Sequence, residues 1–317
     1  MSERSSHTAQ LSVEHETEYH YAAPVDQAQH LACLQPLEDA AQSVLNFGLG
    51  VWPTPALTRH RVDAHGNERH YFALHAAHKE LLVKAVSRVE VSDRYADLDP
   101  QAGATVQEVR DRLTYRAQAP FESACEFLYP SPFVPHLEPL REYALASLLP
   151  ERPLAEAAIE LMQRIHDDFD YAPASTDIST PVLDVFTARK GVCQDFAHLM
   201  LACLRSCGLA ARYVSGYLLT RPPEGQAPLV GADASHAWLS VWVPGLGCKL
   251  ANDWLDLDPT NACVPTTHHV RVAQGRDFGD VTPLRGVIRG GGEHTLMVRV
   301  TTRLIEPHGQ TPLIAPI

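Results

Sequence analysis

A helix that begins at a cysteine constrains this sequence most. In the stretch CQDFAHLMLACLRSC, apolar residues from Phe196 to Leu204 cover most of the circumference, so the helix must lie inside the protein. Gly208 supplies its end. Cys193 in the first turn lies near backbone N–H groups without intrahelical acceptors and near the positive end of the helix dipole, both of which favour a thiolate. The sequence therefore predicts a buried helix with a nucleophile at its N-terminus.

Two more helices are expected before it. The run PLAEAAIELMQRIHDDF has Pro153 at a first helical position and an apolar periodicity, which predicts a helix to about Phe169. A second helix is predicted between a cap at Thr180 and a stop at Gly191. Residues 98–152 are irregular and rich in proline, which indicates a connector of short helices.

The front of the chain reads differently. Residues 9–95 alternate polar and apolar positions in short runs, as in LSVEHETEYHY and ELLVKAVSRVEV, which indicates half-buried antiparallel strands. A tight hairpin turn is predicted at residues 63–67, DAHGN. The expected fold class is α+β: an N-terminal β-sandwich (1–97), the helical connector (98–152) and a core (153–317) in which the cysteine helix packs on an antiparallel sheet.

The strands of that core are expected after the helix, in ARYVSGYLLT, HAWLSVWV and WLDLD, with a last strand in EHTLMVRVTTRLIE. Residues 262–292 read as a long Gly-rich segment between them. His236 and Asp258 each lie on one of these predicted strands, so the helix could bring Cys193, an imidazole and a carboxylate together as nucleophile, base and orienting group. The Cys193 N–H is then a candidate for part of an oxyanion hole.

Each member of this set also has an ordinary structural interpretation. A histidine before Ala-Trp is often structural, and an aspartate before Pro-Thr is often a turn residue. Gln194 and Asp195 could point into the site or cap the helix, and capping is favoured. Tyr171 could reach an oxyanion or serve in packing. His198, on another helical face, and the tryptophans of HAWLSVWV are expected in the core.

Composition excludes several classes of protein. The net charge of −12 leaves no basic stripe for nucleic acid or an anionic membrane. The N-terminus lacks the apolar run of a signal peptide, so we expect a cytoplasmic protein, with its seven irregularly spaced cysteines as free thiols. The histidine groups at 75/78, 166–168 and 268/269 lack the spacing of a zinc site, so no metal or other cofactor is predicted.

Several blocks resemble the bacterial members of the transglutaminase-like superfamily. They are GVCQDFAH (191–198), ARYVSGYL, DASHAWLSVW (233–242), LDPTN (257–261) and the tail HHVRVAQGRDFGDVTPLRGV. The front, with HETEYHY and DAHGN, is similar to the family's N-terminal β region, although Ala64 and His65 stand where an aromatic is common. The resemblance implies a β-sandwich followed by a papain-like core, with Cys193 as nucleophile, His236 as general base and acid, and Asp258 as the orienting carboxylate.

The chemistry expected from these three residues is attack on a peptide-like amide and formation of a thioester. Either water or an amine then releases the acyl group, which makes the protein a protease or amidase in one case and a transglutaminase in the other. The sequence does not choose between them, nor does it specify the oligomeric state. A non-catalytic protein that binds a peptide in the same fold is the main alternative, and a metal-dependent hydrolase is a weaker one.

Overall fold

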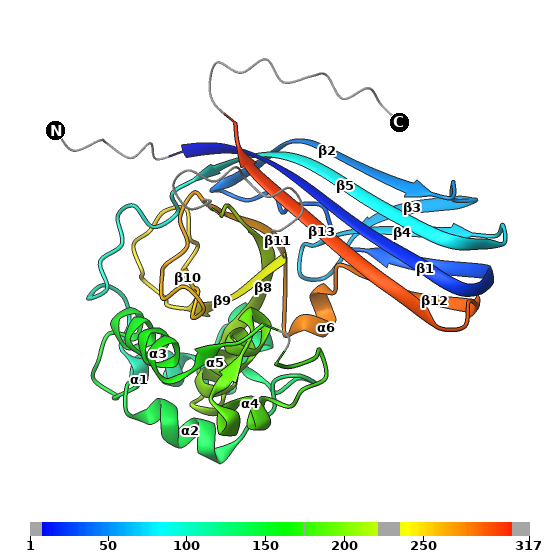
Figure 1. Cartoon of the computed structure of the whole chain (residues 1–317). Helices are drawn as coiled ribbons and strands as arrows, with labels where there is room; N and C mark the ends of the chain where they lie inside the picture. The colour runs from blue at the N-terminus through cyan, green and yellow to red at the C-terminus, as the bar shows by residue number, and fades with distance from the viewer. Residues whose placement is uncertain (1–7, 174, 221–234, 306–317) are drawn as a thin grey trace, which may run out of the picture.

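The computed structural model describes residues 8–173, 175–220 and 235–305 of the 317-residue chain. It contains a seven-stranded antiparallel sheet and, beside it, a four-stranded antiparallel sheet covered by helices (Figure 1). The predicted α+β class is confirmed. The first residues of the DASHAWLSVW block, Asp233 and Ala234, lie outside the described residues.

The larger sheet has the order β2-β5-β1-β4-β3, with β12 and β13 also paired to β1. Its strands are β1 (Thr8–Ala32), β2 (Gln42–Trp52), β3 (Leu57–Val62), β4 (Glu68–Leu74), β5 (His78–Ser92), β12 (Leu284–Gly290) and β13 (His294–Leu304). The predicted hairpin turn joins β3 to β4, where Gly66 adopts the positive φ that a tight turn requires.

This N-terminal part is one curled sheet, where the sequence predicted a two-sheet sandwich. The 25-residue strand β1 runs through both halves of it. Its first half pairs with β5 and β13, and its second half with β4 and β12. The register with β5 shifts between His20 and Val25, and such irregularities bend a strand. The two halves therefore enclose one apolar cluster that includes Val25, Phe72 and Leu81.

The C-terminal strands correct the predicted division of the chain. Residues 284–304 were expected in the core with the rest of 153–317, but β12 and β13 pair with β1 in the N-terminal sheet. Residues 262–292, expected as a Gly-rich segment, contain β11 (His269–Gly275) and α6 (Phe278–Val281) as well as β12. A sequence read strand by strand cannot reveal such pairings, because the partners lie more than 250 residues apart.

The connector does form short helices, namely α1 (Val106–Leu113), the 3-10 helix η1 (Ser123–Leu128) and α2 (Glu138–Leu145). They are followed by α3 (Leu154–Asp168) and α4 (Val182–Ala188), and the two-residue strands β6 (Asp170–Tyr171) and β7 (Lys190–Gly191) pair in parallel. The predicted cap at Thr180 is wrong, because α4 begins after Pro181. It ends at Arg189 in the left-handed conformation, before Gly191.

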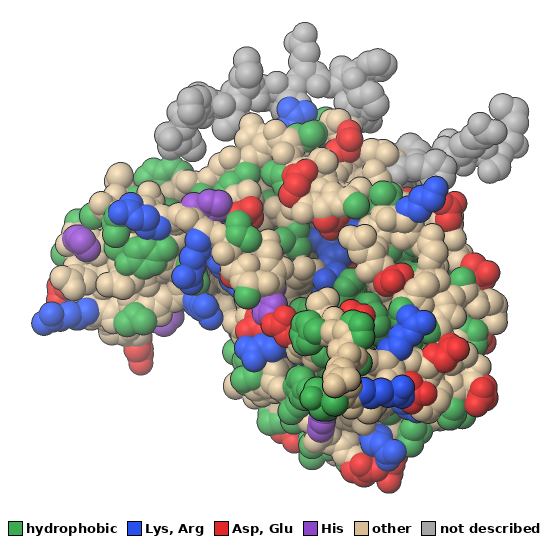
Figure 2. Space-filling model, turned by 180° about the vertical axis from the view of Figure 1, so that it is seen from behind, with side chains coloured by type: hydrophobic (Ala, Val, Ile, Leu, Met, Phe, Trp, Pro, Cys, Tyr) green, Lys and Arg blue, Asp and Glu red, His purple; other side chains and the backbone are tan. Residues whose placement is uncertain are grey.

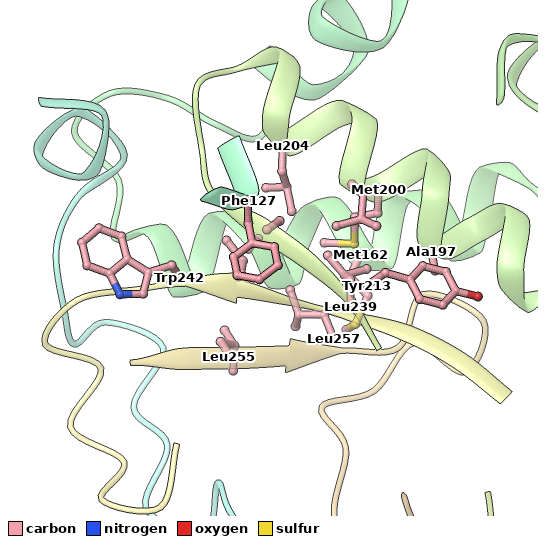
Figure 3. Close-up of a cluster of buried hydrophobic side chains, with 14 of the residues drawn as sticks. Phe127, Met162, Ala197, Met200, Leu204, Tyr213, Leu239, Trp242, Leu255 and Leu257 are labelled. Atoms are coloured by element: carbon pink, nitrogen blue, oxygen red, sulfur yellow. The ribbon is translucent and has the colours of Figure 1, made fainter. Parts of the chain in front are cut away.

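Helix α5 (Cys193–Ser206) lies where the sequence predicted it, inside the core. It packs on a four-stranded sheet of order β10-β9-β8-β11, formed by β8 (Ala211–Leu218), β9 (Ser235–Trp242), β10 (Trp254–Leu257) and β11. Ala197, Met200 and Leu204 of α5 meet Leu239 and Leu257 of the sheet in one continuous cluster (Figure 3). This buried contact fixes the helix relative to the strands that follow it.

Two side-chain amides join the two sheets. The Gln42 amide donates to the Arg271 carbonyl at 2.8 Å and accepts from the Arg271 N–H at 2.8 Å. The Asn67 amide likewise donates to the Gln274 carbonyl and accepts from the Gln274 N–H, each at 2.8 Å. Both backbone partners lie on β11, an edge strand of the smaller sheet. The Leu37 N–H also donates to the Arg271 carbonyl at 3.0 Å. The N-terminal region therefore supplies, mostly with side chains, the partners that a neighbouring strand would give to these buried backbone groups.

Acidic and basic side chains are interspersed over the face of the molecule that Figure 2 shows, with hydrophobic side chains between them. None of the described helices combines the length and the apolar character needed to cross a bilayer.

Candidate active site

The start of α5 is shaped by a side chain that folds back on it. Asp195 is buried, and its Oδ2 accepts hydrogen bonds from the Val192 N–H at 2.9 Å and from the Thr176 hydroxyl at 2.6 Å. It thereby caps the first turn of the helix, the role favoured for it from the sequence. A Cβ at Gly191 would lie 2.8 Å from the Asp195 Cβ, so glycine is needed there. Burial raises the pKa of Asp195, although its hydrogen bonds oppose the shift.

The structure brings together the three residues expected to react. His236 lies on β9, and Asp258 follows the end of β10. The His236 Nε2 is 2.7 Å from the Asp258 Oδ2, and the imidazole also has a hydrogen-bonding contact with the Cys193 side chain. The side chain of Asp258 is fully buried and that of His236 is 10% exposed, whereas Cys193 is partly exposed. The thiol can therefore be reached from outside while its partners are shielded.

The electrostatics of this set favour a charged imidazole. Burial by itself lowers the pKa of His236, but the hydrogen bonds and charges of Asp258 and Cys193 outweigh it and raise the pKa to about 10. Burial likewise works to raise the pKa of Asp258, but its hydrogen bonds to His236, His269 and Asn261 and the His236 charge hold it well below the usual range. Asp258 therefore stays ionised, and His236 is stabilised as an imidazolium beside the sulfur.

Two residues that sequence reasoning did not assign to the site hold Asp258. The His269 Nε2 is 3.2 Å from the Asp258 Oδ2, and the Asn261 amide donates to the same oxygen at 2.7 Å. The other oxygen, Oδ1, accepts from the backbone N–H groups of Thr260 and Asn261. No recognised spacing connects His269 with Asp258, so no motif could have assigned His269 to the site. The only signal in the sequence is the alternation in HVRVAQG, which indicates a strand.

Tyr171 lies close to Cys193. Its strand β6 pairs with β7 in the register Tyr171–Gly191, two residues before Cys193. Burial, and secondarily the charge of Cys193, raises the pKa of the Tyr171 hydroxyl, although the side chain is half exposed. Gln194 is partly exposed in the first turn of α5.

His198, Trp238 and Trp242 lie in the interior of the protein. His198 is buried, and its Nε2 accepts a hydrogen bond from the Phe278 N–H at 3.2 Å. Trp238 and Trp242 are buried as well. Among the described residues, potential metal-binding atoms of His236, Asp258 and His269 come within 4.8 Å of one another. These atoms already share hydrogen bonds, which account for the cluster. Independence from metals and cofactors stays a prediction.

Comparison with known proteins matches these parts of the chain to known families. Residues 11–90 match the bacterial transglutaminase-like N-terminal region, and residues 143–259 match the transglutaminase-like superfamily. An uncharacterized protein of Mycobacterium tuberculosis is 40% identical over 292 residues, which cover 92% of this chain and 91% of the relative. The chain belongs to the transglutaminase-like superfamily. The superfamily match contains Cys193, His236 and Asp258 and ends one residue after the aspartate.

One further relative of this transglutaminase-like protein and one solved structure of similar fold carry functional names. A protein-glutamine gamma-glutamyltransferase of Pseudomonas aeruginosa is 33% identical over 127 residues, which span 39% of this chain but 18% of the relative. The crystal structure of a proposed cysteine protease from Cytophaga hutchinsonii superposes with a TM-score of 0.72 and 18% identity, covering 96% of this chain and 93% of that one. At this identity the structural likeness establishes the fold alone, and it does so over both sheets.

Proposed function

We propose that this protein is a cysteine enzyme that acts on amide bonds of peptides or proteins through a thioester. The observation that carries the proposal is the position of His236, whose imidazole is bound on one side to the buried Asp258 and meets on the other the thiol at the start of α5. A thiol, an imidazole and a carboxylate in this order form an activated nucleophile.

In the first half-reaction, the Cys193 thiolate attacks the carbonyl carbon of the amide. The electron pair of the carbonyl moves to its oxygen, and the resulting oxyanion faces N–H groups of the first helical turn, which have no intrahelical acceptor. Collapse of this intermediate breaks the C–N bond, and the amine leaves with the proton of His236. The products are a free amine or ammonia, a thioester on Cys193 and a neutral imidazole.

Tyr171 is proposed as a second contact for the oxyanion or the substrate. It is half exposed, and its strand pairs with the segment that leads into Cys193. A phenol with a raised pKa remains protonated at neutral pH, so it can donate a hydrogen bond. Gln194 is the other candidate for a substrate contact, whereas the carboxylate of Asp195 is occupied by capping.

The second half-reaction needs an acceptor, which the neutral His236 deprotonates as it attacks the thioester carbonyl. The C–S bond then breaks, and Cys193 leaves as a thiolate beside the imidazolium. Water would give hydrolysis and an amine would give acyl transfer. The relatives carry names of both kinds, a protein-glutamine gamma-glutamyltransferase and a proposed cysteine protease. We propose a peptide or protein amide as substrate and leave the acceptor to the experiment. Incubation with an unfolded protein and a fluorescent primary amine distinguishes them, since transfer labels the protein whereas hydrolysis releases ammonia or new N-termini without label.

The experiment that tests the proposed nucleophile is the pH dependence of iodoacetamide alkylation, with mass spectrometry locating the label. Only Cys125, Cys193 and Cys263 are partly exposed, so the other two serve as controls within the same molecule. Burial raises the pKa of Cys263 to about 11, helped by the charge of Asp258. We expect Cys193 to be alkylated at pH 6.5 far faster than Cys263, and His236→Ala to remove this advantage.

Equal rates at Cys193 and Cys125, unchanged in His236→Ala, would contradict the proposal and favour a non-catalytic peptide-binding protein. Metal analysis of the purified protein tests the metal-dependent alternative.

We also propose that the protein works in a reducing cytoplasm, which its seven free cysteines support. Cell fractionation checks this, and recovery outside the cytoplasm would contradict it.

A further inference from the structure

We propose that His269 is a positioning residue of the active site: it holds the Asp258 carboxylate from the opposite edge of the sheet and thereby sets the reactivity of Cys193. The proposal rests on the proposed function, because it gives His269 a part in activating the same nucleophile. It adds a fourth side chain to the Cys193–His236–Asp258 set.

The carboxylate of Asp258 is fixed from several directions. Its Oδ1 is bound by two backbone N–H groups, so that oxygen follows the turn after β10. Its Oδ2 is the oxygen that meets His236, and it is bound by side chains alone: His236 at 2.7 Å, Asn261 at 2.7 Å and His269 at 3.2 Å. The direction of Oδ2 therefore depends on groups that substitution can remove one at a time.

Of these partners, Asn261 and His269 differ in rigidity. Asn261 is exposed, and its amide also lies 3.3 Å from the His236 Nε2, so it can turn toward either group. His269 is 7% exposed, and its ring stands edge-on to the buried Trp238 with centroids 5.4 Å apart at 80°. A buried ring held by an aromatic neighbour has few alternative orientations. His269 is therefore the partner that can restrain Oδ2.

The fold brings His269 to Asp258 across the whole four-stranded sheet. The strand order is β10-β9-β8-β11, so β11 and the end of β10 belong to opposite edges. Between them Gly216 of β8 pairs with both His236 and Arg271, and a Cβ on it would lie 2.4 Å from the Trp238 ring. The absence of a side chain there lets Trp238 lie over β8, between the two edges. The sheet is thus built to place His269 within reach.

The hydrogen bonds of His269 assign its tautomer. Its Nε2 faces a carboxylate that cannot donate when ionised, so Nε2 carries the proton. Its Nδ1 is buried and has no partner among the described residues, and the same holds for the Arg271 Nε. Both residues line a cavity of about 10 Å³, a size that suits one water molecule with polar neighbours. His269 accordingly donates to Asp258 rather than competing with it for a proton.

The anchoring of β11 extends this role to the N-terminal region. Gln42 binds both backbone groups of Arg271, which lies two residues along the strand from His269. The strand that carries His269 is therefore held by the N-terminal sheet.

The test is the alkylation rate of Cys193 at pH 6.5, which needs no substrate, in His269→Leu, His269→Gln and the wild type, each also combined with Asp258→Asn. Outer hydrogen-bond partners of metal ligands commonly contribute about 10- to 100-fold to activity, and we expect about a tenfold loss in His269→Leu. His269→Gln keeps an N–H donor and should recover much of the rate. In the Asp258→Asn background the His269 substitutions should change the rate less than twofold, because the residue acts through the carboxylate.

The matched control is His30→Leu, since His30 is likewise buried with one ring nitrogen unpartnered but lies in the N-terminal sheet. Circular dichroism establishes that each variant is folded. Equal rates in His269→Leu and the wild type would overturn the proposal, as would a full tenfold loss in the Asp258→Asn background. A wild type whose Cys193 reacts no faster than Cys125 would instead defeat the proposed function, which distinguishes the two failures.

Discussion

His236 of the four-stranded sheet differs in charge state from His15 and His30 of the N-terminal sheet. In the N-terminal sheet, burial lowers the pKa of His15 and of His30 to about 4, and the side-chain partners of His15 are the hydroxyls of Thr17 and Tyr217. In the four-stranded sheet, the His236 side chain is similarly enclosed, yet its pKa rises to about 10 because Asp258 and Cys193 outweigh burial. The comparison shows that the partner, and not the depth, decides whether an enclosed imidazole is charged.

The two groups contribute to stability in opposite pH ranges. His15 and His30 are neutral in the folded state and gain a proton more easily when unfolded, so their stabilisation is lost as the pH falls from about 6.5 toward 4. His236 has a folded pKa above its unfolded value, so its contribution is present below about 6.5 and is lost as the pH rises toward 10.

Of the substitutions that test this comparison, Asp258→Asn should have the largest effect. It gives His236 a neutral partner, as His15 has, and so removes the charge that stabilises its imidazolium. General base and acid groups typically contribute about 10²- to 10⁴-fold, and we expect the alkylation of Cys193 at pH 6.5 to fall about 100-fold. Cys125 is the control in the same molecule, and its rate should not change. A variant that keeps the wild-type rate at Cys193 would show that Asp258 does not set the charge of His236.

His30→Gln tests the neutral histidines of the N-terminal sheet. A pKa lowered from 6.5 to about 4 corresponds to roughly 3 kcal/mol of acid destabilisation, which the variant no longer has. The measurement is the urea midpoint at pH 7, 5 and 4. We expect His30→Gln to be less stable than the wild type at pH 7, because it loses the His30 ring that stacks on Phe72. The difference in urea midpoint between the two proteins should shrink as the pH falls.

The control for this titration is His75→Gln, since His75 is exposed on the loop before β5. Its urea midpoints should follow those of the wild type. Curves for His30→Gln that run parallel to the wild type at all three pH values would mean that the buried imidazole does not titrate on unfolding.

The junction between the two sheets should respond to Gln42→Ala. The substitution leaves the Arg271 N–H without its partner, whereas the Arg271 carbonyl keeps its hydrogen bond from the Leu37 N–H at 3.0 Å. A buried unpaired polar group costs about 1–3 kcal/mol, so we expect a loss of about 2 kcal/mol in urea unfolding. Gln107→Ala is the matched control, because Gln107 is exposed and its side chain makes one hydrogen bond, to Asp111, among the described residues. Equal losses in both variants would mean that the Gln42 bonds add nothing to the attachment of β11.

The sequence was most informative where periodicity and chain order carry the structure. The burial of α5, its start at Cys193 and the strands β8 to β10 follow from apolar patterns in windows of about ten residues. The contact between His236 and Asp258 was predicted from a motif, since the two lie 22 residues apart, one on β9 and the other just after β10. The capping by Asp195 was one of two readings, and only the geometry of Val192 and Thr176 distinguishes them.

The parts that sequence reasoning missed depend on pairings far apart in the chain. The alternation in β13 predicts a strand but does not say that the strand pairs with β1, so the division at residue 153 placed it in the wrong sheet. His269 was considered only with its neighbour His268 as a metal site, and it was set aside because the spacing does not fit one. Its actual partner depends on the order of the strands, which no local pattern contains.

A last comparison concerns the same cap in two helices. Asp195 binds the Val192 N–H at the start of α5, and Glu108 binds the Thr105 N–H at the start of α1, at 2.9 and 2.8 Å. Loss of a capping side chain costs about 0.5–2 kcal/mol. We expect Asp195→Ala to lie at the upper end, because its carboxylate is buried and also binds Thr176, and Glu108→Ala at the lower end, because it is exposed.

Thermal unfolding measures both losses, and alkylation separates their consequences. Since Cys193 lies in the turn that Asp195 caps, Asp195→Ala should slow its alkylation about threefold, whereas Glu108→Ala should leave the rate unchanged. Equal slowing in both variants would attribute the effect to general destabilisation. A loss of stability in Asp195→Ala without any change at Cys193 would mean that the cap holds the helix but not the nucleophile, and the first turn of α5 would then be positioned by its packing on the sheet.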